Sequence, residues 1–140
     1  MAGSQTKSLE QKIDEFLSAP SFAVAGASDD VNKYGYKVYS CYLQNGRKAY
    51  PINPRVEKIL GNPSFKTIDS LPEKVESISI ITPPQVTEKV VEEAIAAGVK
   101  NVWMQPGAES QSAIEKAEQA GLNVIAGGPC VLVVMGYHGH

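Results

Sequence analysis

The sequence has little cysteine and histidine, the residues that most often mark metal and redox sites. Its two cysteines, Cys41 and Cys130, lie far apart in the chain, so no closely spaced pair indicates a zinc site or a thioredoxin-like motif. Its two histidines, His138 and His140, stand in a GYHGH tail, where a frayed terminus is a simpler interpretation than catalysis or metal binding. We expect no metal site, and this cysteine usage is typical of a reducing, cytoplasmic setting.

Long apolar runs and a surplus of basic charge are also lacking. The longest apolar run, CVLVVMG, is too short to span a bilayer, and the opening stretch MAGSQTKSLEQK lacks the apolar core of a signal peptide. The formal net charge is -2 and the sequence pI is near 5.7, which argues against a general nucleic-acid binder. We therefore expect neither a membrane nor a nucleic acid as a partner, and the sequence points to no protein partner.

What the sequence does contain is enough apolar residues for one packed domain. The 140 residues are 43% hydrophobic and 20% charged, which suits a single globular core. Branched apolar runs alternate with stretches of helical periodicity. Strands are predicted over 22–25, 48–53, 77–82, 99–105 and 122–128, and helices over 9–17, 34–45, 85–97 and 110–120. The turn-rich segment 54–75 is expected to hold a brief extended piece at 59–60 and a helical turn near Leu71.

This alternation predicts a three-layer α/β fold, in which an open parallel sheet of about five strands carries helices on both faces. We expect a single domain over 8–137, with a flexible N-terminus over 1–7 and a tail over 138–140. Ligands of such sheets bind beyond the carboxyl ends of the strands. The loops that follow the five strands should therefore meet at one edge: 26–33, 53–55, 82–84, 105–107 and 127–130.

The first of these loops, GASDDVNKYGY, has the composition of a phosphate-binding turn. Gly26 allows a tight turn, Ala27 and Ser28 are small enough for a ligand to approach the backbone, and Lys33 supplies charge. The helix that follows would point unpaired N–H groups at an anion. The acids Asp29–Asp30 must then face away from that anion. A plain strand-to-helix turn with an aspartate cap and no ligand remains the alternative.

The loop does not match the dinucleotide fingerprint. The pattern G-x-G-x-x-G requires glycines at positions 28 and 31, where Ser28 and Val31 stand. An acidic residue should also close the second strand to hold the ribose, but that strand ends in INPR. Arg55 suits a phosphate near the ribose, as in NADP or a 3′-phosphorylated adenosine, although a solvated surface arginine is the alternative.

The three remaining loops carry weaker indications. The prolines of TPP, 82–84, can form a flat wall against an adenine ring or simply end the strand. Gln105 offers a polar side chain before a Pro-Gly turn. The final loop, AGGPC, offers glycines, a proline and the thiol of Cys130, which is either a small packing residue or a thiol beside the site.

Taken in order, the segments VAGAS with KYGYKV, YPINP, ITPP, VWMQPG and GGPC give the chain a family resemblance over roughly residues 8–137. It resembles the small stand-alone CoA-binding proteins with a Rossmann-like fold, which are related to the N-terminal CoA-binding domain of the succinyl-CoA synthetase alpha subunit. The resemblance implies a Rossmann-like α/β domain whose ligand is coenzyme A.

The resemblance also assigns roles to the loops. The first would line the phosphates, Arg55 would replace a synthetase lysine that binds phosphate, 82–84 would flank the adenine, and 104–106 would lie near the pantetheine arm. The synthetase turn Gly-Pro-Asn-Cys is one residue longer than GGPC. The implied CoA-binding residues are Gly26, Ala27, Ser28, Asp29, Lys33, Asn53, Pro54, Arg55, Thr82, Pro83, Pro84, Met104, Gln105, Pro106, Gly128, Pro129 and Cys130.

The synthetase reaction needs features that this sequence does not supply. A synthetase uses a second domain with a phosphorylated histidine and a partner subunit, and no carboxylate pair or Ser-His-Asp set is placed here for chemistry. We therefore expect a non-catalytic domain that binds CoA or acyl-CoA, with no catalytic residues. The alternatives are a small NADP-dependent oxidoreductase and a thiol-redox protein in which Cys130 forms a mixed disulfide with CoA.

Overall fold

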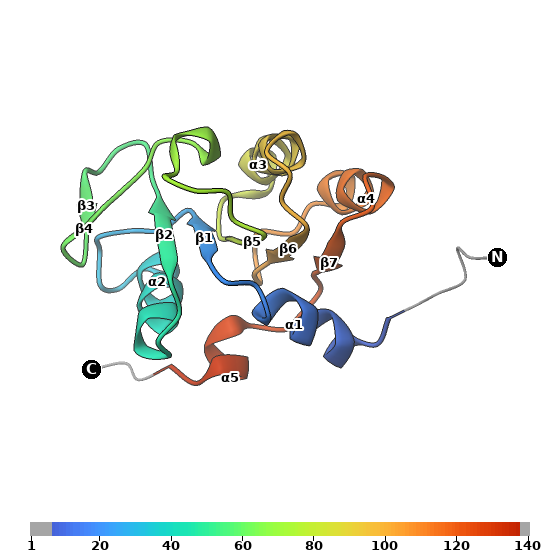
Figure 1. Ribbon diagram of the computed structural model, residues 1–140, viewed down its shortest axis with the longest axis horizontal. Helices are drawn as coiled ribbons and strands as arrows, with labels where there is room; N and C mark the ends of the chain where they lie inside the picture. The colour runs from blue at the N-terminus through green and yellow to red at the C-terminus, as the bar shows by residue number, and fades with distance from the viewer. Residues whose placement is uncertain (1–6, 138–140) are drawn as a thin grey trace.

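A computed structural model describes residues 7–137, in which strands and helices alternate along the chain (Figure 1). The expectations for residues 1–6 of the N-terminus and for the tail at 138–140, with both histidines, lie outside the described residues. Among residues 7–137 no helix has the length and apolar character needed to cross a membrane.

Five parallel strands form the central sheet, and each is short and largely buried. They are β1 (Phe22–Ala25), β2 (Ala49–Ile52), β5 (Ser77–Ile80), β6 (Asn101–Met104) and β7 (Asn123–Ile125). The order across the sheet is β2-β1-β5-β6-β7, with every neighbouring pair parallel. The predicted five-strand open parallel sheet is confirmed, and each strand lies inside its predicted range.

Helices cover both faces of the sheet, as predicted (Figure 1). On one face lie α1 (Leu9–Leu17), α2 (Tyr34–Gln44) and α5 (Val131–Met135), and on the other lie α3 (Pro84–Ala96) and α4 (Gln111–Gln119) with the short 3-10 helix η2 (Ile68–Ser70). The single-domain, three-layer, Rossmann-like α/β architecture is therefore confirmed.

The two faces bury different kinds of side chain. The α3–α4 face is aliphatic, built from residues such as Ile78, Val91 and Val102. The α1–α2–α5 face is aromatic: Phe16 meets Trp103 edge-on with ring centroids 5.2 Å apart, and Phe22 stacks on Tyr42 at 4.9 Å. Burial of each such side chain contributes about 1.5–3 kcal/mol to the free energy of folding. The sheet is therefore a stable support for the loops at its edge.

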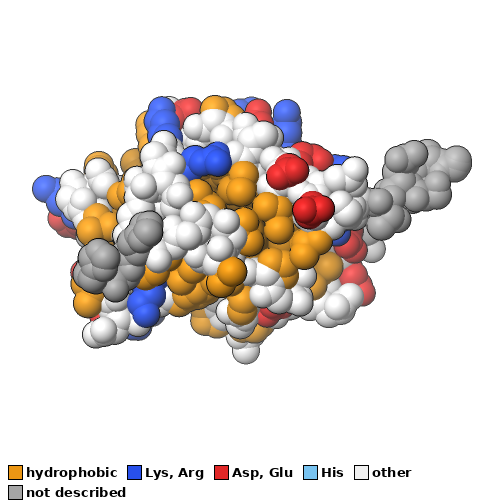
Figure 2. Space-filling model, turned by 90° about the horizontal axis from the view of Figure 1, so that it is seen from below, with side chains coloured by type: hydrophobic (Ala, Val, Ile, Leu, Met, Phe, Trp, Pro, Cys, Tyr) orange, Lys and Arg blue, Asp and Glu red, His pale blue; other side chains and the backbone are white. Residues whose placement is uncertain are grey.

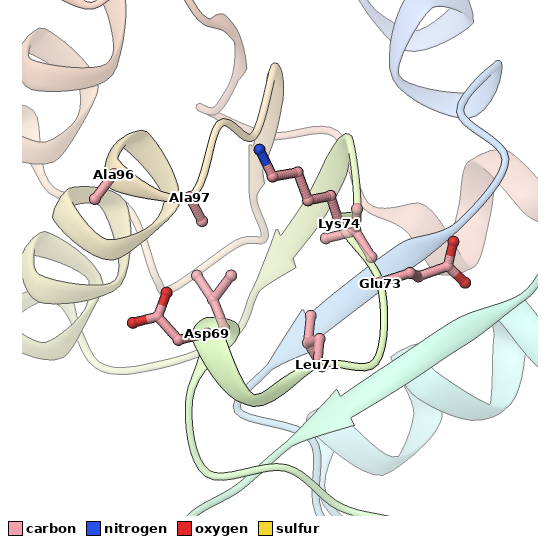
Figure 3. A pocket seen from close by; sticks show the side chains of 8 residues that line it. Asp69, Leu71, Glu73, Lys74, Ala96 and Ala97 are labelled. Carbon is pink, nitrogen blue, oxygen red and sulfur yellow. The ribbon is translucent and has the colours of Figure 1, made fainter.

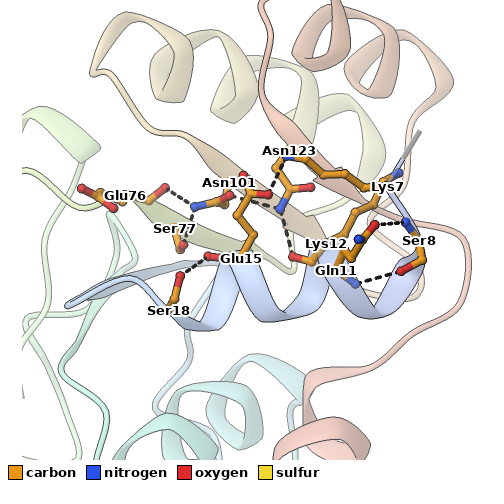
Figure 4. Close-up of polar contacts among 10 residues, drawn as sticks. All are labelled: Lys7, Ser8, Gln11, Lys12, Glu15, Ser18, Glu76, Ser77, Asn101 and Asn123. Carbon is orange, nitrogen blue, oxygen red and sulfur yellow. Dashed lines mark hydrogen bonds and ion pairs between the residues drawn. The ribbon is translucent and has the colours of Figure 1, made fainter. Parts of the chain in front are cut away.

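The amino ends of three strands fasten α1 to the sheet (Figure 4). Ser77, Asn101 and Asn123 stand in register as the first residues of β5, β6 and β7. The Ser77 hydroxyl donates to the Phe16 carbonyl at 2.8 Å, and the Asn123 amide donates to the Lys12 carbonyl at 2.9 Å. The Asn101 amide joins the series by donating to Ser77 Oγ at 3.0 Å. This polar row occupies the amino edge of the sheet and leaves the carboxyl edge to the loops.

Two features of the structure go beyond the predicted elements. The segment 54–75 forms a small hairpin of β3 (Lys58–Ile59) and β4 (Asn62–Pro63), whose turn places both Leu60 and Gly61 at positive φ. The run after Cys130 forms the five-residue helix α5, which the sequence did not predict because an unbroken apolar run has no helical period. Tertiary packing determines the helical conformation of that segment, in which Val131 is fully buried.

Candidate ligand-binding site at the carboxyl edge of the sheet

The winding of the sheet reverses between β1 and β5, because α2 follows β1 on one face and α3 follows β5 on the other. Such a switch point is where open α/β sheets bind ligands. Gly26, at φ +94°, starts the loop after β1 there, and its N–H donates to the Ile52 carbonyl at 3.1 Å. A Cβ atom on Gly26 would lie 3.1 Å from the Ile81 carbonyl carbon and 3.2 Å from the Thr82 nitrogen, so the neighbouring loop leaves no room for a side chain.

A second glycine brings α2 against the end of β1. A Cβ atom on Gly35 would fall 2.0 Å from the Gly26 carbonyl oxygen, so only glycine allows this approach. Close helix–strand packing is the role of the third glycine in dinucleotide-binding turns. The sequence comparison looked for glycines at 28 and 31 and missed this one, although the segment KYGYKV contains it.

The two helices that begin at the switch point have no side-chain caps. Lys33 is the N-cap of α2 and Pro83 is the N-cap of α3, and neither side chain accepts a hydrogen bond from the helix. In contrast, Ser8 caps α1 and Ser110 caps α4 through their hydroxyl oxygens. First-turn N–H groups without a side-chain acceptor attract anions, so the amino end of α2 favours a phosphate group at the switch point. The amino end of α3 contributes less, because Pro84 at its first position has no N–H and the Val86 N–H donates to the Pro83 carbonyl at 2.9 Å.

The loop between β1 and α2 is held by its own polar groups. Ser28 Oγ accepts the Asp30 N–H at 3.0 Å, and an Asp30 carboxylate oxygen accepts the Asn32 N–H at 3.0 Å. Asp29 and Asp30 are both exposed, and Lys33 is exposed as well. The Ser28 hydroxyl still carries a proton that it can donate, whereas the Asp30 carboxylate is engaged within its own loop.

Asn53 joins the loop after β2 to this turn. Its amide nitrogen donates to the Ala27 carbonyl at 2.8 Å, and its amide oxygen accepts the Arg55 N–H at 2.8 Å. Both ends of the amide are therefore used in positioning the backbone. Pro54 and Arg55 lie beyond it and are exposed, which leaves the Arg55 guanidinium accessible to a charged ligand.

The loop after β5 is fixed by two threonines. Thr82 Oγ1 lies 2.8 Å from Thr87 Oγ1, and the Thr87 hydroxyl also lies 3.1 Å from the Thr82 carbonyl and 3.2 Å from the Pro83 carbonyl. Pro83 and Pro84 are exposed at the start of α3. Their rings stand at the surface of the candidate site.

Beneath the loops, Gln105 is fully buried at the end of β6 and organises a polar network. Its side-chain oxygen accepts the Val131 N–H at 3.0 Å and the Tyr34 hydroxyl at 3.2 Å, and its side-chain nitrogen donates to Ser79 Oγ at 3.4 Å. Ser79 Oγ in turn lies 2.6 Å from the Tyr42 hydroxyl. Because a backbone N–H can only donate, the Gln105 atom facing Val131 must be the oxygen.

This network fixes the direction of the hydrogen bond at Cys130. Tyr34 has one hydroxyl proton, which goes to Gln105, so the Cys130 thiol 2.7 Å away must donate its own proton to the Tyr34 oxygen. Burial raises the pKa of Tyr34, and the hydrogen bond with Cys130 raises that pKa further, which keeps the phenol neutral. In this arrangement Cys130 is a thiol that holds the start of α5, since Trp103 Nε1 also donates to the Pro129 carbonyl at 3.0 Å.

The structure therefore brings the five predicted loops to one edge, with different exposures. Ala27, Met104 and Gln105 are fully buried, and Gly26, Ser28, Asn53, Thr82, Pro129 and Cys130 are half-buried. The exposed predicted residues are Asp29, Lys33, Pro54, Arg55, Pro83, Pro84, Pro106 and Gly128. Direct contact of each residue with a ligand stays a prediction. Tyr34 and Gly35 join the site as residues that the sequence analysis did not single out.

A separate hollow of about 410 Å³ lies at the opposite edge of the sheet (Figure 3). It is bordered by η2, the turn that precedes β5, and the end of α3, and Asp69, Lys74 and Ala97 are among its lining residues. Figure 3 shows the Asp69 carboxylate on the side of the hollow that faces Ala97. Its position near the amino ends of the strands separates it from the switch point.

The chain is similar to several known proteins. It is 28% identical over 137 residues to the alpha subunit of acetate–CoA ligase [ADP-forming] II of Pyrococcus furiosus, a match that covers 90% of this chain and 30% of that subunit. It is 32% identical over 100 residues to acetate–CoA ligase [ADP-forming] II of Archaeoglobus fulgidus, covering 70% of this chain and 15% of the relative. The chain thus spans less than a third of the length of these curated relatives.

Among solved structures, a hypothetical protein from Pyrococcus horikoshii OT3 superposes with a TM-score of 0.84 and 28% identity, covering 93% of this chain and 94% of that one. A protein of about this length therefore shares the whole fold. The family described as "CoA binding domain" matches residues 20–136, which include all five loops at the carboxyl edge. By that match, together with the fold and the switch point, this chain belongs to the CoA binding domain family.

Proposed function

We propose that this protein holds CoA or an acyl-CoA at the carboxyl edge of its sheet without turning it over. The observation that carries the proposal is the amino end of α2 at the switch point, which has no side-chain cap. The pyrophosphate of CoA is the group that such N–H donors bind best. Gly26 and Gly35 allow the end of β1, the start of α2 and the loop after β5 to pack closely together, which places the α2 end at the switch point.

Charge supports the same ligand. Lys33, at the N-cap of α2, and Arg55, after β2, are both exposed at this edge, while the chain as a whole has a formal net charge of -2. Lys33 would neutralise the pyrophosphate, and the Arg55 guanidinium would form paired hydrogen bonds with the 3′-phosphate. The 82–84 loop would cover the adenine, and the Gln105–Cys130 region would meet the pantetheine arm.

The polar groups near that arm support binding rather than chemistry. Gln105, Tyr34 and Cys130 satisfy one another's hydrogen bonds, so none of the three is left free as a general base. The longer relatives are named as ligases. For this chain we propose CoA binding alone. We propose that it does so in the cytoplasm, where CoA would be available as a ligand.

Titration calorimetry of the protein with CoA, dephospho-CoA and NADPH tests the proposal. CoA at about 100 times its Kd should stabilise the protein by about 2.7 kcal/mol, visible as a rise in Tm. Dephospho-CoA should bind more weakly because it lacks the Arg55 partner, and NADPH should not displace CoA at equal concentration. Absence of heat and of any Tm shift at millimolar CoA would contradict the proposal.

A further inference from the structure

An apolar surface lies on the face of the molecule formed by α1 and α5 (Figure 2). Val133 is 81% exposed and Val134 is 41% exposed on α5, and Leu9 is 49% exposed on α1. Figure 2 shows hydrophobic side chains running together across these two helices. Within residues 7–137 nothing covers Val133, and contiguous apolar patches of this kind mark interaction surfaces.

The composition of α5 makes this exposure unusual. The helix reads VLVVM and contains no polar residue, yet only Val131 is fully buried against the core. A helix that is apolar all round belongs in an interior. A second contact on its outer side would complete that burial.

The flanks of the surface carry opposite charge. On α1, the exposed acids Glu10 and Asp14 each stand three residues before a half-buried apolar residue, Ile13 and Leu17, so they border the apolar stripe. On α2, Lys37 stands three residues after Tyr34 and four before Cys41. Both Tyr34 and Cys41 contact the Cys130–Gly136 segment, so Lys37 lies on the stripe of α2 that borders α5.

Figure 2 shows acidic side chains on one side of the apolar surface and basic side chains on the other. A surface with an apolar centre and opposite charges on its two flanks is complementary to itself. A two-fold axis lying in the plane of this surface brings the α1 flank of one copy against the α2 flank of the other.

We propose that this surface pairs with the same surface of a second copy, giving a symmetric homodimer with α5 at its centre. Val133 and Val134 of the two copies pack across the axis, and Lys37 of each copy faces the acidic flank, Glu10 and Asp14, of the other. A closed two-fold contact uses the surface completely and leaves no edge for further growth. The proposal does not depend on CoA binding.

Sedimentation velocity of the full chain over a range of concentrations tests the pairing. The wild-type protein should change from monomer to dimer as concentration rises, and Val133→Asp should raise the dissociation constant about tenfold or more, since a buried charge at the centre of an interface is costly. Val86→Asp is the matched control, because Val86 is 44% exposed on α3, on the other face. Val86→Asp should leave the dissociation constant unchanged.

Charge reversal tests the two-fold arrangement. Lys37→Glu and Asp14→Lys should each weaken the dimer, and the double variant should recover it because the complementary pair is restored with its signs exchanged. Circular dichroism checks that all variants fold. A wild-type chain that stays monomeric at every concentration, or equal behaviour of Val133→Asp and Val86→Asp, would overturn the proposal. So would failure of the double variant to recover association, which would assign the surface to a different partner.

Discussion

Gly35 lies so close to Gly26 that a Cβ atom on Gly35 would fall 2.0 Å from the Gly26 carbonyl oxygen. This contact sets the first turn of α2 directly on the end of β1, at the point where the sheet reverses its winding. The sequence of this turn differs from the dinucleotide-binding pattern because Gly35, the glycine that packs the helix against the strand, comes later in the chain than the pattern's third glycine. The loop between the two glycines, 27–34, is correspondingly long.

Gly35→Ala should destabilise the protein strongly. The added methyl group meets backbone atoms that cannot move aside, so we expect a loss of about 3 kcal/mol or more, at the upper end for overpacking. Urea denaturation measures it. Gly107→Ala is the control: it has positive φ, +95°, but nothing within 4 Å of the new Cβ, so only backbone strain of about 1–2 kcal/mol is expected. Equal losses in the two variants would contradict the close contact.

Lys33→Ala and Arg55→Ala should weaken CoA binding in different ways. Loss of Lys33 removes a charge beside the pyrophosphate, so the affinities for CoA and dephospho-CoA should fall together, by about tenfold. Loss of Arg55 should weaken CoA by about tenfold and leave dephospho-CoA nearly unchanged.

Calorimetry at constant salt checks both variants. Lys100→Ala is the control, because Lys100 pairs with Glu76 at the amino edge, with Lys100 Nζ 3.7 Å from a Glu76 carboxylate oxygen. It should bind both ligands as the wild type does. If Arg55→Ala weakens the affinities for CoA and dephospho-CoA equally, Arg55 does not bind the 3′-phosphate.

Tyr34→Phe should loosen the start of α5. The substitution keeps the ring but leaves the Cys130 thiol and one acceptor position of Gln105 without a partner, at a cost of about 1–2 kcal/mol. Hydrogen exchange at the Val131 amide should speed up, because that N–H donates to the same Gln105 oxygen. Tyr36→Phe is the control on the same helix: Tyr36 is a half-buried tyrosine outside this network, so its substitution should change neither quantity. Unchanged exchange at Val131 in Tyr34→Phe would count against the network.

Alkaline pH should destabilise the protein partly through Cys41. Burial raises the pKa of this thiol from 9.0 to about 11 in the folded state. Between those values the unfolded chain releases a proton that the folded chain keeps, so stability is complete below about pH 9 and is lost as pH rises toward 11. At 1.36 kcal/mol per unit of pKa, the loss is about 2–3 kcal/mol.

The measurement is the free energy of unfolding as a function of pH for the wild type and Cys41→Ala. The variant should show a shallower decline between pH 9 and 11, although its stability at neutral pH is lower because a buried side chain is truncated. The half-buried phenol of Tyr34 and the buried phenol of Tyr42 also have raised pKa values, so part of the decline in stability with pH remains in both proteins. Parallel curves would show that Cys41 does not titrate as described.

Much of the fold could be predicted because local patterns and global packing agree. Branched apolar runs gave all five strands of the sheet, and the glycines and prolines after them marked the carboxyl edge. The helix α5 could not be predicted from periodicity, because its sequence VLVVM is apolar at every position and packing against α2 decides its conformation.

The site was predictable at the level of loops and less so at the level of side chains. Lys33 and Arg55 lie exposed at the expected edge, whereas Gln105 and Met104 point into the protein, because a β-strand end gives no sign of which face its last residue meets. Gly35 escaped notice because its requirement comes from a contact with Gly26 in three dimensions. That Asp29 and Asp30 face away from the anion stays a prediction, although the Asp30 carboxylate accepts the Asn32 N–H within its own loop.

The most direct test of the account is an NMR titration of the isotopically labelled protein with CoA. Saturable shifts should centre on the backbone amides of Ser28, Tyr34 and Gly35, with further changes at Thr82 and around Arg55, because the pyrophosphate lies at the switch point. The hollow at the opposite edge, near Asp69 and Ala97, should be silent. Shifts centred on that hollow, or none at millimolar CoA, would contradict the central claim.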